Sequence, residues 1–290
     1  MEYFSILIYP PWRKQRKMKF GTCNEYFENW PIEQVFEYAA EIGYHGVEIA
    51  PFTLAPSVEE IPAERRREIR RAAERAGVEI IGLHWLLVSP EGLYINHIDD
   101  HIRGRTRDYF KALIQFCGDL EGQVMIIGSP QQRNVQEGWD HQETWNRTRE
   151  VFEDCLSLAQ ERGVYLCIEP LSRDQTNFIS TAAQARQMIA EIDHPHFQTM
   201  MDACSGSTEK RSVPQLLEDS ARHLYHVHAN DANKRGPGFG QTDFVGILET
   251  LKKLNYERYV SVEVFDFEPD PRTIAAASLA YLRGVQAALA

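Results

Sequence analysis

The feature that most constrains the fold is a regular alternation of short apolar runs with amphipathic stretches along almost the whole chain. Each apolar run has the length of a strand, and each amphipathic stretch follows the 3.6-residue period of a helix. Such alternation predicts a parallel sheet in which every strand is followed by a helix. The expected strands cover residues 19–24, 46–51, 78–87, 123–130, 164–170, 197–204, 224–231 and 259–265. The expected helices cover residues 31–43, 57–76, 101–117, 140–162, 181–192, 213–221, 242–254 and 272–288.

Eight such units predict an α/β fold, a closed (β/α)8 TIM barrel that forms a single domain over residues 18–290. Their combined length is close to the roughly 250 residues typical of this barrel. No linker rich in proline, glycine or serine divides the units. The alternative is an open doubly wound sheet, but the chain has no G-x-G-x-x-G turn to support it.

Residues 1–17 precede the first expected strand, and we interpret them as an N-terminal extension. An apolar stretch, 2–12, comes before a basic one, 13–17. A secretory signal has its basic residues first and a longer apolar region, so export is not expected. No apolar run reaches the roughly 18 residues that a membrane span needs. The extension is either a stretch upstream of the true start or an arm that packs on the barrel or on a partner.

The balance of charge and the cysteines limit the partners and the compartment. Lysine and arginine number 31 against 42 aspartates and glutamates, a formal net charge of −11. Because affinity for nucleic acid comes largely from basic side chains on phosphates, no nucleic-acid partner is expected. The five cysteines are odd in number and include no C-x-x-C motif. This pattern predicts reduced thiols in a cytoplasmic protein.

Four successive strands each carry a carboxylate or an imidazole near the carboxyl end: Glu169, Asp202, His228 and Glu263. Their separations of 33, 26 and 35 residues each match one βα unit. In a TIM barrel these strand ends form the active-site face. An unpaired buried carboxylate costs several kcal/mol, and a bound cation removes that cost. Because carboxylates and an imidazole form a hard, oxygen-rich donor set, we predict one divalent metal ion here.

Several short motifs, taken in order, resemble those of the xylose-isomerase-like barrel superfamily of sugar isomerases and epimerases. The resemblance covers about residues 18–288 and is greatest to ketose 3-epimerases, inosose isomerases and hydroxypyruvate isomerases. Metal-dependent abasic-site endonucleases are more distant. The matching motifs are I-E-P-L (168–171), M-D-A (201–203), H-V-H-A-N-D (226–231), G-P-G-F-G (236–240) and S-V-E-V-F (261–265).

The resemblance implies a single divalent ion held by Glu169, Asp202, His228 and Glu263. Mn2+ is the expected ion, with Mg2+, Co2+ or Zn2+ as alternatives. It also implies that Glu169 and Glu263 act as acid and base on opposite faces of a carbohydrate. One would remove the proton next to a carbonyl to give a metal-stabilised enediolate, and the other would return a proton. Relatives of this kind also lead us to expect a homo-oligomer.

Three positions depart from the pattern of the ketose epimerases that the chain resembles. Gln175 stands where those enzymes carry a second glutamate, and Ser205 stands where they carry histidine. Lys234, followed by Arg235, stands where they carry arginine. The expected metal ligands are intact, so we predict the family's metal chemistry with a different sugar.

Five residues are candidates for binding substrate: His84, Glu48, Arg133, Gln175 and Lys234. The alternative for His84 and Glu48 is a satisfied polar residue of the core. For Lys234 it is an ordinary surface charge near the glycine-rich stretch 236–240. The aromatic residues near the strand ends, including Trp85, are expected to pack in the core, except for Phe239 in a loop.

The leading interpretation is a divalent-metal-dependent sugar isomerase or epimerase. The alternative is a metal-dependent lyase or deglycosidase that acts on 3-keto-glycosides by β-elimination, since Gln175 and Ser205 break the free-sugar pattern. An abasic-site endonuclease would need three metal ions, more histidines and a less acidic surface. A barrel without activity would have no need for the four ligands.

Overall fold

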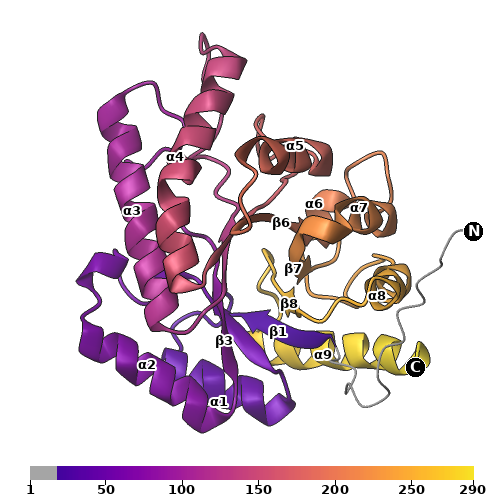
Figure 1. The fold of residues 1–290 in the computed structure, drawn as a ribbon. Helices are drawn as coiled ribbons and strands as arrows, with labels where there is room; N and C mark the ends of the chain where they lie inside the picture. The colour runs from indigo at the N-terminus through magenta and orange to yellow at the C-terminus, as the bar shows by residue number, and fades with distance from the viewer. Residues whose placement is uncertain (1–17) are drawn as a thin grey trace, which may run out of the picture.

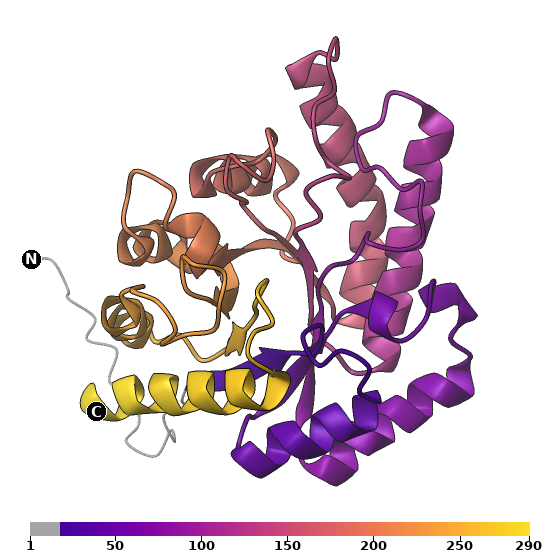
Figure 2. The ribbon, with the colours of Figure 1, turned by 180° about the vertical axis from the view of Figure 1, so that it is seen from behind.

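The computed structural model describes residues 18–290, and the expected extension, residues 1–17, lies outside them. Eight parallel strands close into a barrel in sequence order, and β1 pairs with β8. Figures 1 and 2 show the helices packed around this barrel. The predicted single-domain TIM barrel is therefore confirmed. The strands are β1 (Lys19–Cys23), β2 (Gly46–Ile49), β3 (Glu79–Leu83), β4 (Val124–Ile127), β5 (Tyr165–Ile168), β6 (Phe197–Asp202), β7 (Leu224–Ala229) and β8 (Tyr259–Val262).

The helices follow the strands as the sequence predicts, with local differences. The expected helix 57–76 is interrupted, because Pro62 lacks an N–H and instead precedes the first turn of α2. A short helix, α6, directly follows β6. The α-helices are α1 (Ile32–Ile42), α2 (Ala63–Ala76), α3 (Asp100–Asp119), α4 (His141–Arg162), α5 (Ala182–Ile192), α6 (Ala203–Gly206), α7 (Val213–Ser220), α8 (Phe244–Lys253) and α9 (Pro271–Ala288). The 3-10 turns are η1 (Pro51–Thr53), η2 (Val58–Glu60) and η3 (Ala221–His223). In residues 18–290 no helix combines the length and apolarity needed to cross a membrane.

The strands are shorter than expected at their carboxyl ends. The third was expected to reach residue 87, but β3 ends at Leu83 and Trp85 adopts a left-handed backbone with φ 50°. The eighth ends at Val262, so Glu263 lies just past the pairing. Trp85 and Glu263 therefore lie beyond the paired strands, at the carboxyl end of the barrel.

The barrel interior is divided into two halves of different polarity. Alternate positions of β3 to β6 supply a small buried cluster, the apolar half, made of Ile81, Val124, Ile126, Cys167 and Met200. Strands β2, β7 and β8 contribute the polar half, made of Glu48, His226, His228 and Ser261, each at most 1% exposed. A much larger apolar core lies between the barrel and its helices. The polar half is therefore withdrawn from solvent and requires internal partners.

Candidate metal centre and active site

The four predicted ligands converge at the carboxyl ends of the strands. Glu169 directly follows β5, Asp202 ends β6, His228 lies in β7 and Glu263 directly follows β8. One ligand atom from each lies within 4.8 Å of all the others, and all four side chains are buried. The parallel register explains the convergence, since Asp202 pairs with His228 on the neighbouring strand.

The donor set fits a divalent cation. Burial, followed by the charges of Glu263 and Asp202, raises the pKa of Glu169 well above its usual range. His228 Nδ1 lies 2.9 Å from Glu263 Oε2, yet neither atom has a hydrogen-bond partner among the described residues. Buried polar atoms without partners are costly. A cation with oxygen and nitrogen ligands would satisfy these atoms and offset the repulsion among the three carboxylates.

Asp202 is held in place by its own loop. Its Oδ1 accepts a hydrogen bond from the Ser205 N–H at 2.6 Å, which caps α6. Its Oδ2 accepts a second from the Asn230 amide at 2.5 Å. Each oxygen retains a further lone pair for a cation. The short helix therefore positions the predicted ligand Asp202. It also positions Ser205, one of the three residues that differ from the ketose-epimerase pattern.

Glu48 lies in the polar half of the interior. Its Oε1 is 3.1 Å from His228 Nε2, and its Oε2 is 2.7 Å from His226 Nε2. Although burial opposes ionisation, the two histidines lower the pKa of Glu48 well below its usual value. A carboxylate on the distal nitrogen of a metal-binding imidazole fixes its tautomer and orientation. This placement favours a role for Glu48 in orienting His228. Contact of Glu48 with substrate remains a prediction.

His84 is buried beside the same cluster. Its Nε2 is hydrogen-bonded to Glu25 Oε2 at 2.8 Å, and its Nδ1 is 3.7 Å from Glu48 Oε1. Cys23 also lies close enough to form triads of potential ligands, one with Glu25 and His84 and another with Glu48 and His228. In these triads Glu25 already pairs with His84, and Glu48 already pairs with His228. A substrate contact of His84 remains a prediction.

Arg133 connects the end of β4 with the loop that follows β5. The side chain is 1% exposed and donates to the carbonyls of Ile127 at 3.2 Å and Ile179 at 3.4 Å. Burial lowers the pKa of Arg133 to about 10, against the attraction of Glu169. The guanidinium therefore lies in the electrostatic field of a predicted ligand. Its predicted contact with substrate is not tested by these bonds.

Two of the three positions that differ from the ketose-epimerase pattern contact each other. Ser205 Oγ donates to Gln175 Oε1 at 3.2 Å, and Ser172 Oγ donates to the same oxygen at 2.7 Å. Lys234, the third, is exposed in the loop after β7 and has a left-handed backbone with φ 69°. Its carbonyl accepts from the Phe265 N–H at 2.9 Å, which ties this loop to the one after β8. The rim beside the four ligands is therefore neutral where Gln175 and Ser205 meet.

Three contacts of the site were not predicted. Glu25 follows β1 and pairs with His84, a position that the alternation of β1 beyond Cys23 could have indicated. Trp85 donates from Nε1 to Glu263 Oε1 at 2.8 Å, whereas the sequence suggested simple packing. Gly128 directly follows β4 and lies against Glu169. Hydrogen bonds and close approaches of this kind have no periodic signal in the sequence.

Gly128→Ala should weaken metal binding. A Cβ at this position would overlap Glu169 Oε2, so the carboxylate would have to move. We expect about a 10- to 100-fold loss of Mn2+ affinity, the size typical of a misoriented ligand, measured by isothermal titration calorimetry. The matched control is Gly284→Ala in α9, where a Cβ meets no described atom within 4 Å. Wild-type affinity in Gly128→Ala would contradict the close approach.

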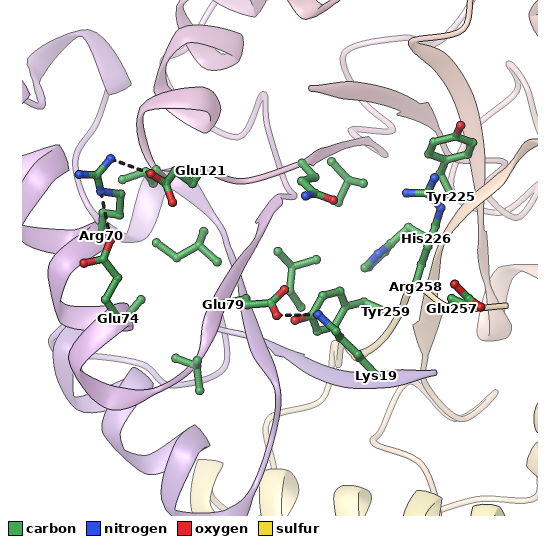
Figure 3. A pocket seen from close by; sticks show the side chains of 17 residues that line it. Lys19, Arg70, Glu74, Glu79, Glu121, Tyr225, His226, Glu257, Arg258 and Tyr259 are labelled. Carbon is green, nitrogen blue, oxygen red and sulfur yellow. Dashed lines mark hydrogen bonds and ion pairs between the residues drawn. The ribbon is translucent and has the colours of Figure 1, made fainter. Parts of the chain in front are cut away.

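A separate cavity of about 850 Å³ opens at the opposite end of the barrel (Figure 3). Lys19 and Glu79, which begin β1 and β3, form an ion pair of 2.5 Å in its wall, and the buried His226 also lines it. None of the four predicted ligands does. The amino-terminal end of a TIM barrel serves stability, whereas chemistry takes place at the carboxyl end. The site therefore lies at the four ligands and not in this cavity.

Comparison with known proteins assigns the family. The profile of the xylose isomerase-like TIM barrel matches residues 36–285. The chain belongs to the xylose isomerase-like TIM barrel family. This membership confirms the family expected from the motifs.

Two curated proteins match nearly the full chain. The chain is 28% identical over 282 residues to the 3-dehydro-D-guloside 4-epimerase of Escherichia coli (strain K12), covering 92% of this chain and 99% of that protein. It is 25% identical to the fructoselysine 3-epimerase of Shigella flexneri, with 92% and 98% covered. The structure of 3-keto-D-glucoside 4-epimerase from E. coli superposes with a TM-score of 0.80 at 24% identity, covering 92% of this chain and all of that one. At this identity the superposition shows the shared fold.

Proposed function

We propose that this protein is a divalent-metal-dependent sugar epimerase or isomerase. The observation that carries the proposal is the convergence of Glu169, Asp202, His228 and Glu263, with ligand atoms within 4.8 Å of one another at the catalytic end of the barrel. The relatives that match nearly the whole chain are epimerases of sugar derivatives. The four side chains would hold one ion, with Mn2+ the proposed identity.

The two glutamates supply the proton transfers. A bound ion would polarise the substrate carbonyl and so acidify the neighbouring C–H. Glu169 or Glu263 takes this proton, and the C–H electron pair moves toward the carbonyl oxygen, which leaves a planar carbon. The other glutamate donates a proton to the opposite face, so the configuration inverts. Donation to the former carbonyl carbon instead gives isomerisation, with the hydroxyl proton of the deprotonated carbon passing to the former carbonyl oxygen.

The three residues that differ from the ketose-epimerase pattern, Gln175, Ser205 and Lys234, favour a substrate other than a free ketose. Gln175 and Ser205 form a neutral hydrogen-bonded pair, in positions where the ketose epimerases that the chain resembles carry an acid and a histidine. Lys234, in the loop after β7, adds an exposed cation. We propose that Gln175, Lys234 and His84 contact substrate hydroxyls. Arg133 and Glu48 are buried, which favours indirect roles. Arg133 would stabilise the charge of Glu169, and Glu48 would orient His228.

The same neutral pair also supports the second candidate, a lyase or deglycosidase of 3-keto-glycosides. Glu169 or Glu263 would remove the proton next to the ketone as before. The electron pair would then form a carbon–carbon double bond and expel the group at the β position with its bonding electrons, and a proton would neutralise it. Epimerisation and elimination therefore differ only in the fate of the deprotonated carbon.

The deciding experiment is deuterium exchange in D2O. The Mn2+-loaded protein would be incubated with ketoses, inososes, keto acids and 3-keto-glycosides, then cleared of Mn2+ and read by NMR. We expect deuterium at the carbon next to one ketone, together with an epimer or isomer. Release of the aglycone would instead favour elimination. A protein that carries one metal per chain and exchanges no proton in any of these compounds would contradict the proposal.

A homo-oligomeric state and a cytoplasmic location are also proposed, both from the sequence. Light scattering in solution would test the first, and fluorescence imaging of the tagged protein in cells would test the second. The proposed substrate is a small carbohydrate, and the net charge of −11 gives no support to a nucleic-acid partner.

A further inference from the structure

Trp85 has an unusual backbone and an unusual partner. It lies two residues past the end of β3 with φ 50°, a left-handed conformation that bulky residues rarely adopt. Its indole Nε1 donates to Glu263 Oε1 at 2.8 Å, across the barrel mouth from β3 to β8. Strained backbone conformations often mark functional sites. A residue needed only for packing would gain nothing from this strain.

The indole plane is fixed by its neighbours. Phe52 stacks on Trp85 with ring centroids 5.8 Å apart and an interplanar angle of 25°. Phe265 also stacks on it, at 6.1 Å and 15°. Aromatic rings in such pairs prefer a limited set of relative orientations. Since these rings come from the ends of three different strands, the direction of the indole N–H is set by the barrel itself.

The hydrogen bond makes the two oxygens of Glu263 different. Oε1 accepts from Trp85, whereas Oε2 lies 2.9 Å from His228 Nδ1, inside the group of four ligands. The terminal torsion of a glutamate is otherwise broad and nearly two-fold, so either oxygen could face the metal. The bond also reduces the freedom of the carboxylate to swing out of the site.

We infer that Trp85 is a positioning residue that holds Glu263 with Oε2 toward the metal and Oε1 on the indole. The inference rests on the proposed function, in which Glu263 is both a ligand and an acid–base group. Orientation of a ligand by a hydrogen-bonded neighbour changes affinity or activity by about 10- to 100-fold. The role makes no demand on the identity of the sugar.

The test uses protein labelled with ¹⁵N at the tryptophan indole. Titration with Mg2+ or Zn2+, which are not paramagnetic, should shift the Trp85 indole signal more than any other. Trp145 is the matched internal control, because its Nε1 also donates to a carboxylate, Glu191 Oε2 at 2.6 Å, but between α4 and α5. Its signal should stay in place. Trp85→Phe and Trp145→Phe assign the two signals.

Kinetics separate positioning from packing. Trp85→Phe, and a variant with benzothienylalanine at 85 that keeps the ring shape but has no N–H, should both lower kcat about tenfold or more with little change in KM. Trp145→Phe should lower the melting temperature and leave kcat unchanged. If either Trp85 variant keeps the wild-type kcat, the inference is overturned.

Elemental analysis of the same samples distinguishes the two ways of failing. A protein that binds one metal without shifting the Trp85 signal would overturn this inference alone. A protein that binds no metal would overturn the proposed function, and the inference with it.

Discussion

Replacing Glu263 with Gln should lower deuterium incorporation into substrate by at least about 10³-fold, because an amide cannot take a proton from carbon. The change preserves shape, and the amide oxygen can still accept from the Trp85 N–H described above. It removes the negative charge that the metal ion requires from this ligand. The measurement is the rate of C–H exchange in D2O, with the metal content determined on the same sample.

Glu257→Gln is the matched control for Glu263→Gln. Glu257 is exposed and lines the cavity at the opposite end of the barrel (Figure 3). This variant should exchange protons at the wild-type rate. Retained exchange in Glu263→Gln, with a fold confirmed by circular dichroism, would remove Glu263 from the acid–base pair.

Removing the metal should abolish exchange and destabilise the fold at the same time. Without a cation, three buried carboxylates face one another, and the pKa of Glu169 rises because its ionised form is opposed by burial and by its neighbours. A ligand present at about 1,000 times its Kd stabilises the native state by about 4 kcal/mol. For a chain of this size that corresponds to about 8 °C in Tm.

The experiment compares protein treated with a chelator, the same protein after Mn2+ is restored, and the Asp202→Asn variant. Restored Mn2+ should recover both the exchange rate and the melting temperature of the wild type. Asp202→Asn lacks one anionic ligand and should show a much smaller thermal shift. Full exchange in a preparation free of metal would exclude the proposed chemistry.

The positions of Glu169, Asp202, His228 and Glu263 could be predicted because two simple rules apply to them. Strand alternation decides which side chains point inward, and the βα repeat brings the strand ends together. The break before Ala63 also has a local cause in Pro62, although the amphipathic pattern concealed it. These features depend on near neighbours in the chain or on the symmetry of the fold.

The remaining contacts depend on side chains that are distant in sequence. Gln175 and Ser205 are 30 residues apart, and only the packing of the loops after β5 and β6 makes them partners. Trp85 meets Glu263 across 178 residues because the backbone turns at the end of β3. No periodicity reports on such pairs, so their existence requires coordinates.

The division of the barrel interior has a consequence for protein engineering. We expect substitutions that alter activity to concentrate on the polar half and on the loops that carry Gln175 and Ser205, whereas Ile81, Val124 and Ile126 belong to the apolar half. Many enzymes lose stability as they gain new activities, because one set of residues serves both purposes. In this barrel the apolar positions of β3 and β4 are separate from the proposed site, whereas on β5 and β6 Cys167 and Met200 lie two residues before Glu169 and Asp202. A library that varies Gln175 and Ser205 for new sugars could be combined with stabilising changes at Ile81, Val124 or Ile126 chosen beforehand, and the two sets of mutations should add nearly independently.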